Sequence, residues 1–162
     1  GRLESIATQG NRQVFVDFAH NPDGLIKSLE SLNQTFGKKL VVVFGCGGDR
    51  DRSKRAPMAE SVRQFADQAF ITSDNSRSEP PEQIFAPLKK VLPHARVIKN
   101  RTDAIYQALK TQKPDEIVVV AGRGHEGIKV DSATELIAPL ERTQNVRDAD
   151  MIHHCLAQLP HW

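Results

Sequence analysis

Two runs of consecutive apolar residues, Val41–Phe44 and Ile117–Val120, constrain the fold of this chain more than any other feature. Both runs are continuous rather than alternating, which is the pattern of strands that are buried on both faces. Such strands occur in parallel sheets whose two faces are covered by helices. The two runs therefore predict a sheet with helices on both sides.

Further strands and helices alternate around these two runs. β-rich segments predict strands at Gln13–Phe18, Lys39–Phe44, Gln68–Thr72, Ala95–Lys99 and Glu116–Ala121. Apolar residues at helical spacing predict helices at Pro22–Phe36, Ser53–Ala66, Pro81–Leu92, Arg101–Lys110 and Asn145–Leu159. This alternation predicts right-handed βαβ units. We expect one three-layer, Rossmann-like α/β domain over residues 1–162 with a mostly parallel sheet, in which Gly127–Leu140 adds a short strand and a turn.

The composition excludes several classes of protein. Of the 162 residues 39% are apolar, enough for a core that needs no disulfide or metal. The 22 basic and 20 acidic residues nearly balance, which argues against a nucleic-acid-binding protein. No apolar run approaches the roughly 20 residues that span a bilayer, and no signal-like segment opens the chain. Cys46 and Cys155 make no disulfide framework, so a reducing cytoplasm is the expected location.

Polar residues collect in four loops that follow predicted strands. These loops are Asp17–Asp23, Gly45–Arg52, Ser73–Arg77 and Gly122–Gly127. In a parallel sheet they meet at the carboxyl edge, where ligands bind. Glycines in the second loop let a ligand approach the backbone, and Arg50 and Arg77 each offer a two-pronged donor for a carboxylate or phosphate. With Asp74 and Glu126 nearby to receive ammonium groups, the set predicts a site for a zwitterion.

Other interpretations of these loops stay open. The same Gly, Asp and Asn residues commonly form turns and helix caps. Gly122–Gly127 fits the G-x-G-x-x-G pattern of dinucleotide sites, but no convincing βα unit follows it, and a P-loop is absent because Ile128-Lys129 replaces its Lys-Ser/Thr pair. Cys46 is either a reactive thiol near positive charge or a small residue in a tight turn. His153–Cys155 predicts no metal site, because adjacent residues of a helix point in different directions.

The polar loops also carry a resemblance to a known family. The runs Asp17–Asp23, Phe44–Asp51, Asp74–Arg77 and Ala121–Glu126 resemble, in the same order, motifs of the Mur ligases. The opening Gly1–Glu4 resembles the start of the family's C-terminal domain, and the lack of an initial Met agrees with a piece of a longer protein. The resemblance runs from Gly1 to about Glu126. It is greatest to the ligases that add the third residue of the peptidoglycan stem peptide.

The resemblance implies the third domain of a bacterial cytoplasmic ligase whose N-terminal UDP-sugar domain and central ATPase domain are absent from this chain. In the implied reaction, ATP converts the D-Glu carboxylate of UDP-MurNAc-L-Ala-D-Glu, the UDP-MurNAc-dipeptide, into an acyl phosphate. The amino group of meso-diaminopimelate then attacks it. ATP and Mg²⁺ would be held mainly by the central domain. The resemblance therefore implies no catalytic residue and no metal ligand in this chain.

Residues that match the motifs take the family's amino-acid-binding roles by resemblance. Arg50 resembles an arginine that grips a carboxylate of the incoming diamino acid. Asp74-Asn75-Ser76-Arg77 resembles the Asp-Asn-Pro-Arg box of enzymes that use meso-diaminopimelate, in which the Arg holds the distal carboxylate. This chain departs from the box at Ser76, which stands in place of the proline and lacks its fixed φ. Gly122 and Glu126 resemble the positions that take up the distal end of the diamino acid.

On the nucleotide side, Asp17, His20 and Asn21 resemble the segment that faces the adenosine part of ATP. Arg2 resembles the hinge arginine that reaches the phosphates. Asn21 and Pro22 also fit a simple helix start. The alternatives are a lysine-adding Mur ligase, a folylpolyglutamate synthase-like ligase with a similar Asp-x-Ala-His-Asn-Pro segment, and a free-standing nucleotide or amino-acid binding module. Neither a nucleic acid nor a membrane is expected as a partner.

Overall fold

The computed structural model describes residues 3–123 and 146–162. Within these ranges the strands are β1 Leu3–Gln9, β2 Arg12–Asp17, β3 Lys39–Phe44, β4 Gln68–Ile71, β5 Arg96–Val97 and β6 Glu116–Ala121. The helices are α1 Pro22–Phe36, α2 Arg55–Phe65, α3 Pro81–Val91, α4 Arg101–Lys110 and α6 Asp148–Ala157, and a 3-10 turn, Arg52–Lys54, precedes α2. None of the helices in these two ranges is long and apolar enough to cross a membrane.

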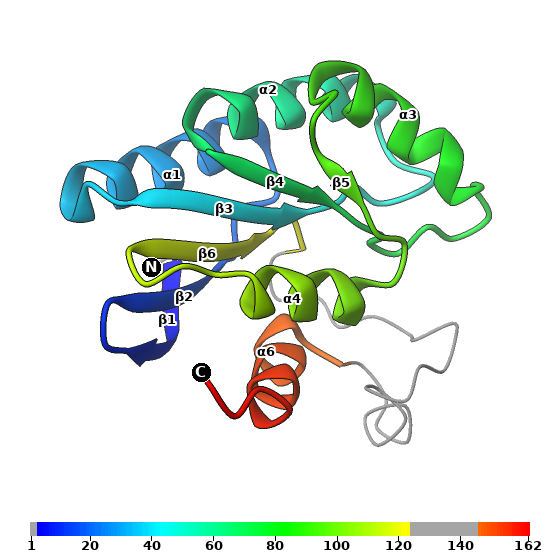
Figure 1. The fold of residues 1–162 in the computed structure, drawn as a ribbon. Coiled ribbons are helices and arrows are strands. Elements are labelled where there is room, and N and C mark those ends of the chain that lie inside the picture. Colours follow the sequence, from blue (N-terminus) through cyan, green and yellow to red (C-terminus); the bar gives the residue numbers. More distant parts are fainter. Residues whose placement is uncertain (1–2, 124–145) are drawn as a thin grey trace.

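The strands form one sheet in the order β1-β2-β6-β3-β4-β5. Every pair is parallel except β1 and β2, which are antiparallel. Figure 1 shows α1, α2 and α3 over one face of the sheet and α4 and α6 over the other. The predicted three-layer, mostly parallel α/β fold is confirmed.

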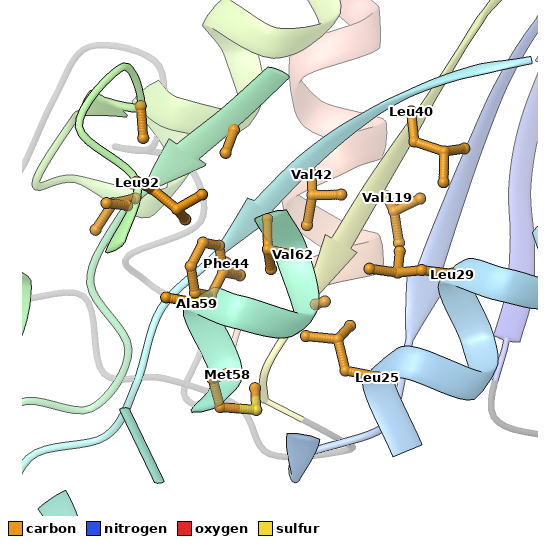
Figure 2. Close-up of a cluster of buried hydrophobic side chains, with 14 of the residues drawn as sticks. Leu25, Leu29, Leu40, Val42, Phe44, Met58, Ala59, Val62, Leu92 and Val119 are labelled. Atoms are coloured by element: carbon orange, nitrogen blue, oxygen red, sulfur yellow. The ribbon is translucent and has the colours of Figure 1, made fainter. Parts of the chain in front are cut away.

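The two apolar runs are buried on both faces of the sheet, as their continuity predicts. In β3, Val42 and Phe44 pack with α1 and α2, while Val41 and Val43 point to the opposite core beneath α4 and α6. Figure 2 shows the first of these cores, where Leu25 and Leu29 of α1 meet the sheet. Alternate residues of one strand thus fill two cores, which leaves no position in the run for a polar side chain.

Helix α1 begins and ends where its sequence signals predict. The Asn21 side chain accepts a hydrogen bond from the Gly24 N–H, and Pro22 occupies the first turn. At the other end Gly37 takes the left-handed conformation, with φ 61°, and its N–H donates to the Asn33 carbonyl. The loop before α1 lies at the carboxyl edge of the sheet because it follows β2, which runs parallel to β6.

The structure differs from the sequence-based prediction in several elements. Strand β1 was not predicted; it is the edge strand of a hairpin with β2. Strand β5 is shorter than Ala95–Lys99, because it pairs only with the end of β4 and its two residues are exposed. The structure starts α2 at Arg55 and confines α6 to Asp148–Ala157. The strand and turn expected in Gly127–Leu140 lie outside the described residues.

Candidate functional site

The loops after β2, β3, β4 and β6 all open at the carboxyl edge of the sheet. Pairing of the last strand residues sets their arrangement: Phe44 lies opposite both Ile71 and Ala121. The loop after β3 therefore runs between the loops after β4 and β6. The predicted gathering is confirmed for the loops after β2, β3 and β4 and for the start of the loop after β6, at Gly122 and Arg123; the rest of that loop lies outside the described residues.

The glycine-rich loop after β3 touches the backbone of both neighbouring loops. The Gly48 N–H donates to the Asn75 carbonyl at 2.8 Å, and a Cβ at Gly48 would overlap the Ser76 carbonyl oxygen. Gly122 has φ 103°, and a Cβ there would lie 2.7 Å from the Gly45 carbonyl oxygen. The glycines thus serve close backbone packing between loops, in addition to any approach of a ligand.

The side chains of Arg50 and Arg77 both approach Gly47 of this loop. Both residues are exposed. A Cβ at Gly47 would lie 3.0 Å from Nη1 of Arg77 and 3.5 Å from Cγ of Arg50. Arg77 has φ 53°, and its Nη1 donates to the carbonyls of Gly48 at 2.9 Å and Asn75 at 3.2 Å. Two arginine side chains from different loops therefore approach the same glycine, and we call this exposed edge around Gly47 the rim.

A buried ion pair beneath Arg77 joins the same two loops. Arg55 holds Glu79 with two hydrogen bonds of 2.7 Å and donates to the Gly47 carbonyl at 3.2 Å. Glu79 also accepts from the Asp49 N–H at 3.1 Å. The hydrogen bonds from Arg55 lower the pKa of Glu79 to about 2, so the carboxylate is charged at neutral pH. Arg55 thus engages both carboxylate oxygens of Glu79 below the surface.

Asp49 adds a second tie between the loops. It has φ 53°, and its Oδ2 accepts hydrogen bonds from the N–H and hydroxyl of Ser78. These bonds, the hydroxyl first, lower the pKa of Asp49. The residues on either side of this contact, Arg50 and Arg77, are thereby fixed relative to each other.

Asp74 and Asn75 lie below the rim rather than on it. The Asp74 side chain is only 8% exposed, lies 3.4 Å from Nε of Arg123, and accepts from the Asn75 N–H at 2.7 Å. Asn75 is half-buried, and its carbonyl receives the Gly48 and Arg77 donors. Of the predicted box, Arg77 is the exposed member. The roles of all four residues toward a substrate stay predictions.

The loop after β2 uses two of its three predicted residues internally. Asp17 is buried, and its Oδ1 accepts from the Ala19 N–H and the Ser28 hydroxyl, both at 3.0 Å. Asn21 caps α1 through the Gly24 N–H at 2.8 Å. His20 is exposed. The structure brings the three together, and His20 is the member whose side chain faces solvent.

Two predicted site residues cannot be placed. Arg2 and Glu126 lie outside the described residues, as does the end of the Gly122–Gly127 pattern. Gly122 itself is half-buried at the end of β6, beside the glycine-rich loop.

Cys46 and the acidic residues add no chemistry of their own. Burial raises the pKa of Cys46 to about 12, so its thiol stays protonated at neutral pH, which favours the small residue in a tight turn. Residues 3–123 and 146–162 hold no group of three or more His, Cys, Asp or Glu side chains that suits a metal ion.

Sequence reasoning missed the buried charges that support the rim. They are Arg55, Glu79, Arg101, Arg123 and Asp148. Arg55 is only 3% exposed, although it ends a run of basic residues of the kind that commonly forms a solvated helix face. Its spacing from Met58 and Val62 places it on the apolar stripe of α2, and this signal was available in the sequence.

Comparisons with known proteins agree with these motifs. The profile of a family described as Mur ligase, glutamate ligase domain, matches residues 1–124. The UDP-N-acetylmuramoyl-L-alanyl-D-glutamate--2,6-diaminopimelate ligase of Lawsonia intracellularis is 43% identical over 129 residues, which are 78% of this chain and 27% of that protein. The ligase of the same name from Caldanaerobacter subterraneus is 36% identical over 152 residues, 91% of this chain and 31% of that protein. The chain thus spans about a quarter to a third of the length of these relatives.

Solved structures show the same fold. A structure of a UDP-N-acetylmuramoyl-L-alanyl-D-glutamate--2,6-diaminopimelate ligase superposes with a TM-score of 0.79 at 34% identity, covering 98% of this chain and 32% of that one. A bifunctional folylpolyglutamate synthase/dihydrofolate synthase with Mn, AMPPNP and L-glutamate bound gives a TM-score of 0.59 at 22% identity, covering 72% of this chain and 28% of that one. At that identity the second likeness concerns the fold alone.

Proposed function

The chain belongs to the Mur ligase family, glutamate ligase domain, and we propose that residues 1–162 form the C-terminal, amino-acid-binding domain of an ATP-dependent peptidoglycan ligase. The proposed enzyme adds meso-diaminopimelate to UDP-MurNAc-L-Ala-D-Glu in the bacterial cytoplasm. Its UDP-sugar and central ATPase domains would lie in parts of the protein that this chain does not include, in line with the longer relatives.

The convergence of Arg50 and Arg77 over Gly47 carries this proposal. Meso-diaminopimelate has a carboxylate at each end, whereas L-lysine has one. Nη1 of Arg77 is engaged by two loop carbonyls, so the Nε–Nη2 edge of the guanidinium is the part that can meet a carboxylate. A second cation at this rim suits a second carboxylate and is of no use to a lysine side chain.

In the proposed reaction this domain binds and orients the amino acid. The D-Glu carboxylate takes the γ-phosphoryl group of ATP, and the amine of the diamino acid attacks the resulting acyl phosphate. The amide bond forms as phosphate leaves and the amine loses a proton. Arg50 and Arg77 would hold the carboxylates so that the reacting amine points out of the rim toward the other domains.

His20 is the proposed nucleotide contact of the loop after β2. Asp17 and Asn21 hold the loop and the start of α1, and His20 is the exposed side chain between them. ATP phosphates and Mg²⁺, which stabilises their charge, would be held mainly by the central domain. Related folylpolyglutamate synthases have been solved with AMPPNP and Mn.

Amino-acid selectivity of the full-length enzyme tests the proposal. Ligation is measured with meso-diaminopimelate and with L-lysine, under saturating ATP and UDP-MurNAc-L-Ala-D-Glu. The proposal predicts a kcat/KM for meso-diaminopimelate at least about 30-fold higher, the lower value for one charge-assisted pair in a desolvated site. An enzyme that prefers lysine, or that ligates glutamate to a folate, would refute it.

A further inference from the structure

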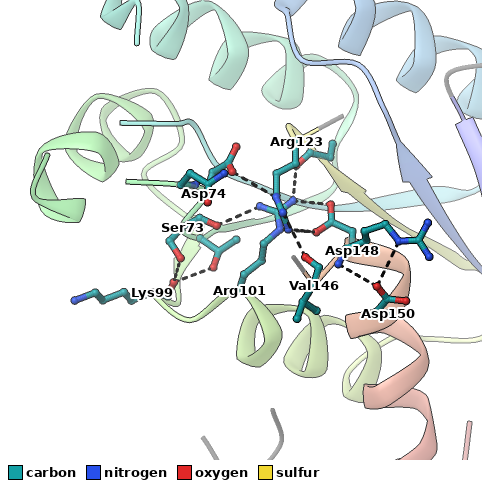
Figure 3. Close-up of polar contacts among 12 residues, drawn as sticks. Ser73, Asp74, Lys99, Arg101, Arg123, Val146, Asp148 and Asp150 are labelled. Carbon is teal, nitrogen blue, oxygen red and sulfur yellow. Dashed lines mark hydrogen bonds and ion pairs between the residues drawn. The ribbon is translucent and has the colours of Figure 1, made fainter. Parts of the chain in front are cut away.

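A network of four buried charges lies directly below the rim, on the side of the sheet that α4 and α6 cover. It consists of Arg101, Asp148, Arg123 and Asp74 (Figure 3). Arg101 binds both oxygens of Asp148, at 2.8 and 2.9 Å. Arg123 donates to the same carboxylate at 3.1 Å and lies 3.4 Å from Oδ1 of Asp74. Two positive and two negative groups thus run from α6 to the loop after β4.

The network also holds the backbone of both loops that carry predicted substrate residues. Nη1 of Arg101 donates to the Ser73 carbonyl at 3.3 Å, and Nη2 donates to the Ala121 carbonyl at 2.9 Å. Ser73 begins the loop that ends in Arg77, and Ala121 precedes Gly122. One buried guanidinium therefore sets the distance between the two loops.

Each member of the network is deeply buried. The side chains of Arg101 and Arg123 are 0% exposed, and those of Asp148 and Asp74 are 5% and 8% exposed. Burial by itself would raise the pKa of Asp148, but Arg101 and Arg123 outweigh it and the pKa lies below its ordinary value. Charges placed this deep are costly unless each is paired, so their geometry is tightly restricted.

A surface pair on the same helix provides the contrast. Nε of Arg147, the residue before α6, lies 3.4 Å from Oδ2 of Asp150 in its first turn, with side chains 68% and 41% exposed. Asp150 also accepts a hydrogen bond from the Arg147 N–H at 3.1 Å, so this pair caps the helix. The buried network is therefore more than a general charge pattern of α6.

We infer that the network positions the diamino-acid pocket, with Asp74 as an anchor of the Asp74–Arg77 loop rather than a ligand of the substrate. The inference rests on the proposed function. Asp74 turns inward to Arg123, which leaves Arg77 as the member of the box that reaches the rim. Asp148 links α6 to this loop through Arg123, so the last helix of the described chain helps to set the position of the substrate carboxylate.

A double-mutant cycle on the full-length enzyme tests the inference. Asp74→Asn and Arg123→Met keep the side-chain volumes and break the same contact. Each should raise the KM for meso-diaminopimelate by about 10- to 100-fold, because a small displacement of Arg77 spoils its geometry. The double variant should be no worse than the weaker of the two enzymes, since the contact is already lost. The KM values for ATP and the UDP-dipeptide should change by less than about twofold.

Further variants separate positioning from simple stability. Arg123→Lys keeps a buried charge but not the fork, so it should recover only part of the KM, and it replaces Arg123→Met in the cycle if the latter is insoluble. Asp148→Asn should resemble Arg123→Met, while Asp150→Asn, its matched control on α6, should leave the KM unchanged. Melting temperatures are recorded for all variants.

The outcomes distinguish the inference from the function on which it rests. A wild type that does not ligate meso-diaminopimelate refutes both. With an active wild type, KM effects of Asp74→Asn and Arg123→Met that multiply in the double variant refute the inference alone. So does an Arg123 variant with a lowered melting temperature and an unchanged KM for the diamino acid.

Discussion

Replacement of Arg77 is the sharpest test of the proposed substrate. Arg77→Ala in the full-length enzyme removes the exposed guanidinium at the rim and its contacts with two loop carbonyls. We expect the loss to appear in the KM for meso-diaminopimelate. The values for ATP and for the UDP-dipeptide should stay near those of the wild type, because Arg77 is proposed to meet the amino acid alone.

The magnitude follows from the surroundings of the guanidinium. A pair that stayed in water would contribute at most about 1 kcal/mol. With Nη1 already fixed and the substrate covering the Nε–Nη2 edge, the pair is partly desolvated, and its loss costs about 2–5 kcal/mol. At about 1.4 kcal/mol per decade, this corresponds to a rise of about 30-fold to several thousand-fold.

Two more substitutions at position 77 distinguish the loss of substrate binding from the effect of backbone strain on stability. Arg77→Lys should recover little, because an ammonium cannot reproduce two parallel hydrogen bonds. Arg77→Gly should be more stable than Arg77→Ala by about 1–2 kcal/mol, since only glycine takes φ 53° without strain. Arg77→Gly and Arg77→Ala should bind meso-diaminopimelate equally poorly.

The assay is phosphate release coupled to ligation, with thermal melting of each variant alongside. Arg63→Ala is the matched control: Arg63 is an exposed arginine that pairs with Glu60 on α2. It should leave all three KM values unchanged. An Arg77→Ala enzyme with the wild-type KM for meso-diaminopimelate would show that Arg77 serves the loop alone, and our reasoning on the substrate would be wrong.

Three further predictions concern the loops around this site. Gly48→Ala should destabilise the fold by about 1–3 kcal/mol and raise the KM for the diamino acid, because its Cβ would overlap the Ser76 carbonyl. The control is Gly10→Ala, at φ 58° in open space, which should cost only about 1–2 kcal/mol and leave this KM unchanged. Equal KM values in the two variants would contradict the prediction. Asn21→Ala should lower stability by about 0.5–2 kcal/mol through the lost cap, whereas Asn21→Ser should keep the cap. Because Asn21 holds the loop and His20 is the proposed nucleotide contact, Asn21→Ser should leave the KM for ATP unchanged, and a KM that rises in this variant would contradict that division of roles. The pKa of Glu79 lies at about 2 instead of 4.5, so its stabilising contribution is complete above pH 4.5 and is lost as the pH falls toward 2. The melting temperature of the wild type should therefore fall more steeply than that of Glu79→Gln over this range, and parallel curves would disprove the reasoning.

The elements best predicted from the sequence are those with local signals at both ends. Helix α1 has Asn21 and Pro22 before it and Gly37 after it, and its bounds agree with the prediction. Strands β3 and β6 also agree, because burial on both faces makes them uninterrupted apolar runs. In these elements local propensity and tertiary packing favour the same structure.

The elements that were missed have weaker or contrary patterns. Strand β1 alternates poorly, although the two-residue Gly10-Asn11 connection to β2 is a hairpin signal that the sequence does contain.

The burial of Arg101 was also missed. Arg101 is a charged residue in a fully buried position, so a hydrophobicity pattern excludes it from the core. Only the pairing with Asp148, 47 residues away in the sequence, allows that position, and single-sequence reasoning has no access to such a pairing.

The rim itself was predictable, but its internal supports were not. Motif order places Arg50 and Arg77 at the carboxyl edge of the sheet, and the structure brings both over Gly47. That Asp74 turns inward follows from its distance to Arg123, which depends on the packing of α6 against the sheet. Sequence motifs mark residues that are used together without showing which of them reach the substrate.

The rim is organised before any substrate arrives. Two residues with left-handed backbone, Asp49 and Arg77, face each other across the loops after β3 and β4, and each holds the opposite loop: Asp49 through Ser78, Arg77 through the Gly48 carbonyl. Such backbone conformations persist only where surrounding contacts enforce them. The arrangement holds the loops of Arg50 and Arg77 in place in the free protein. Meso-diaminopimelate and lysine both bring a distal ammonium to this rim, but only meso-diaminopimelate brings a carboxylate beside it, so lysine would add a positive charge that nothing in the ligand compensates. Discrimination would thus arise as much from repulsion of the wrong amino acid as from attraction of the right one.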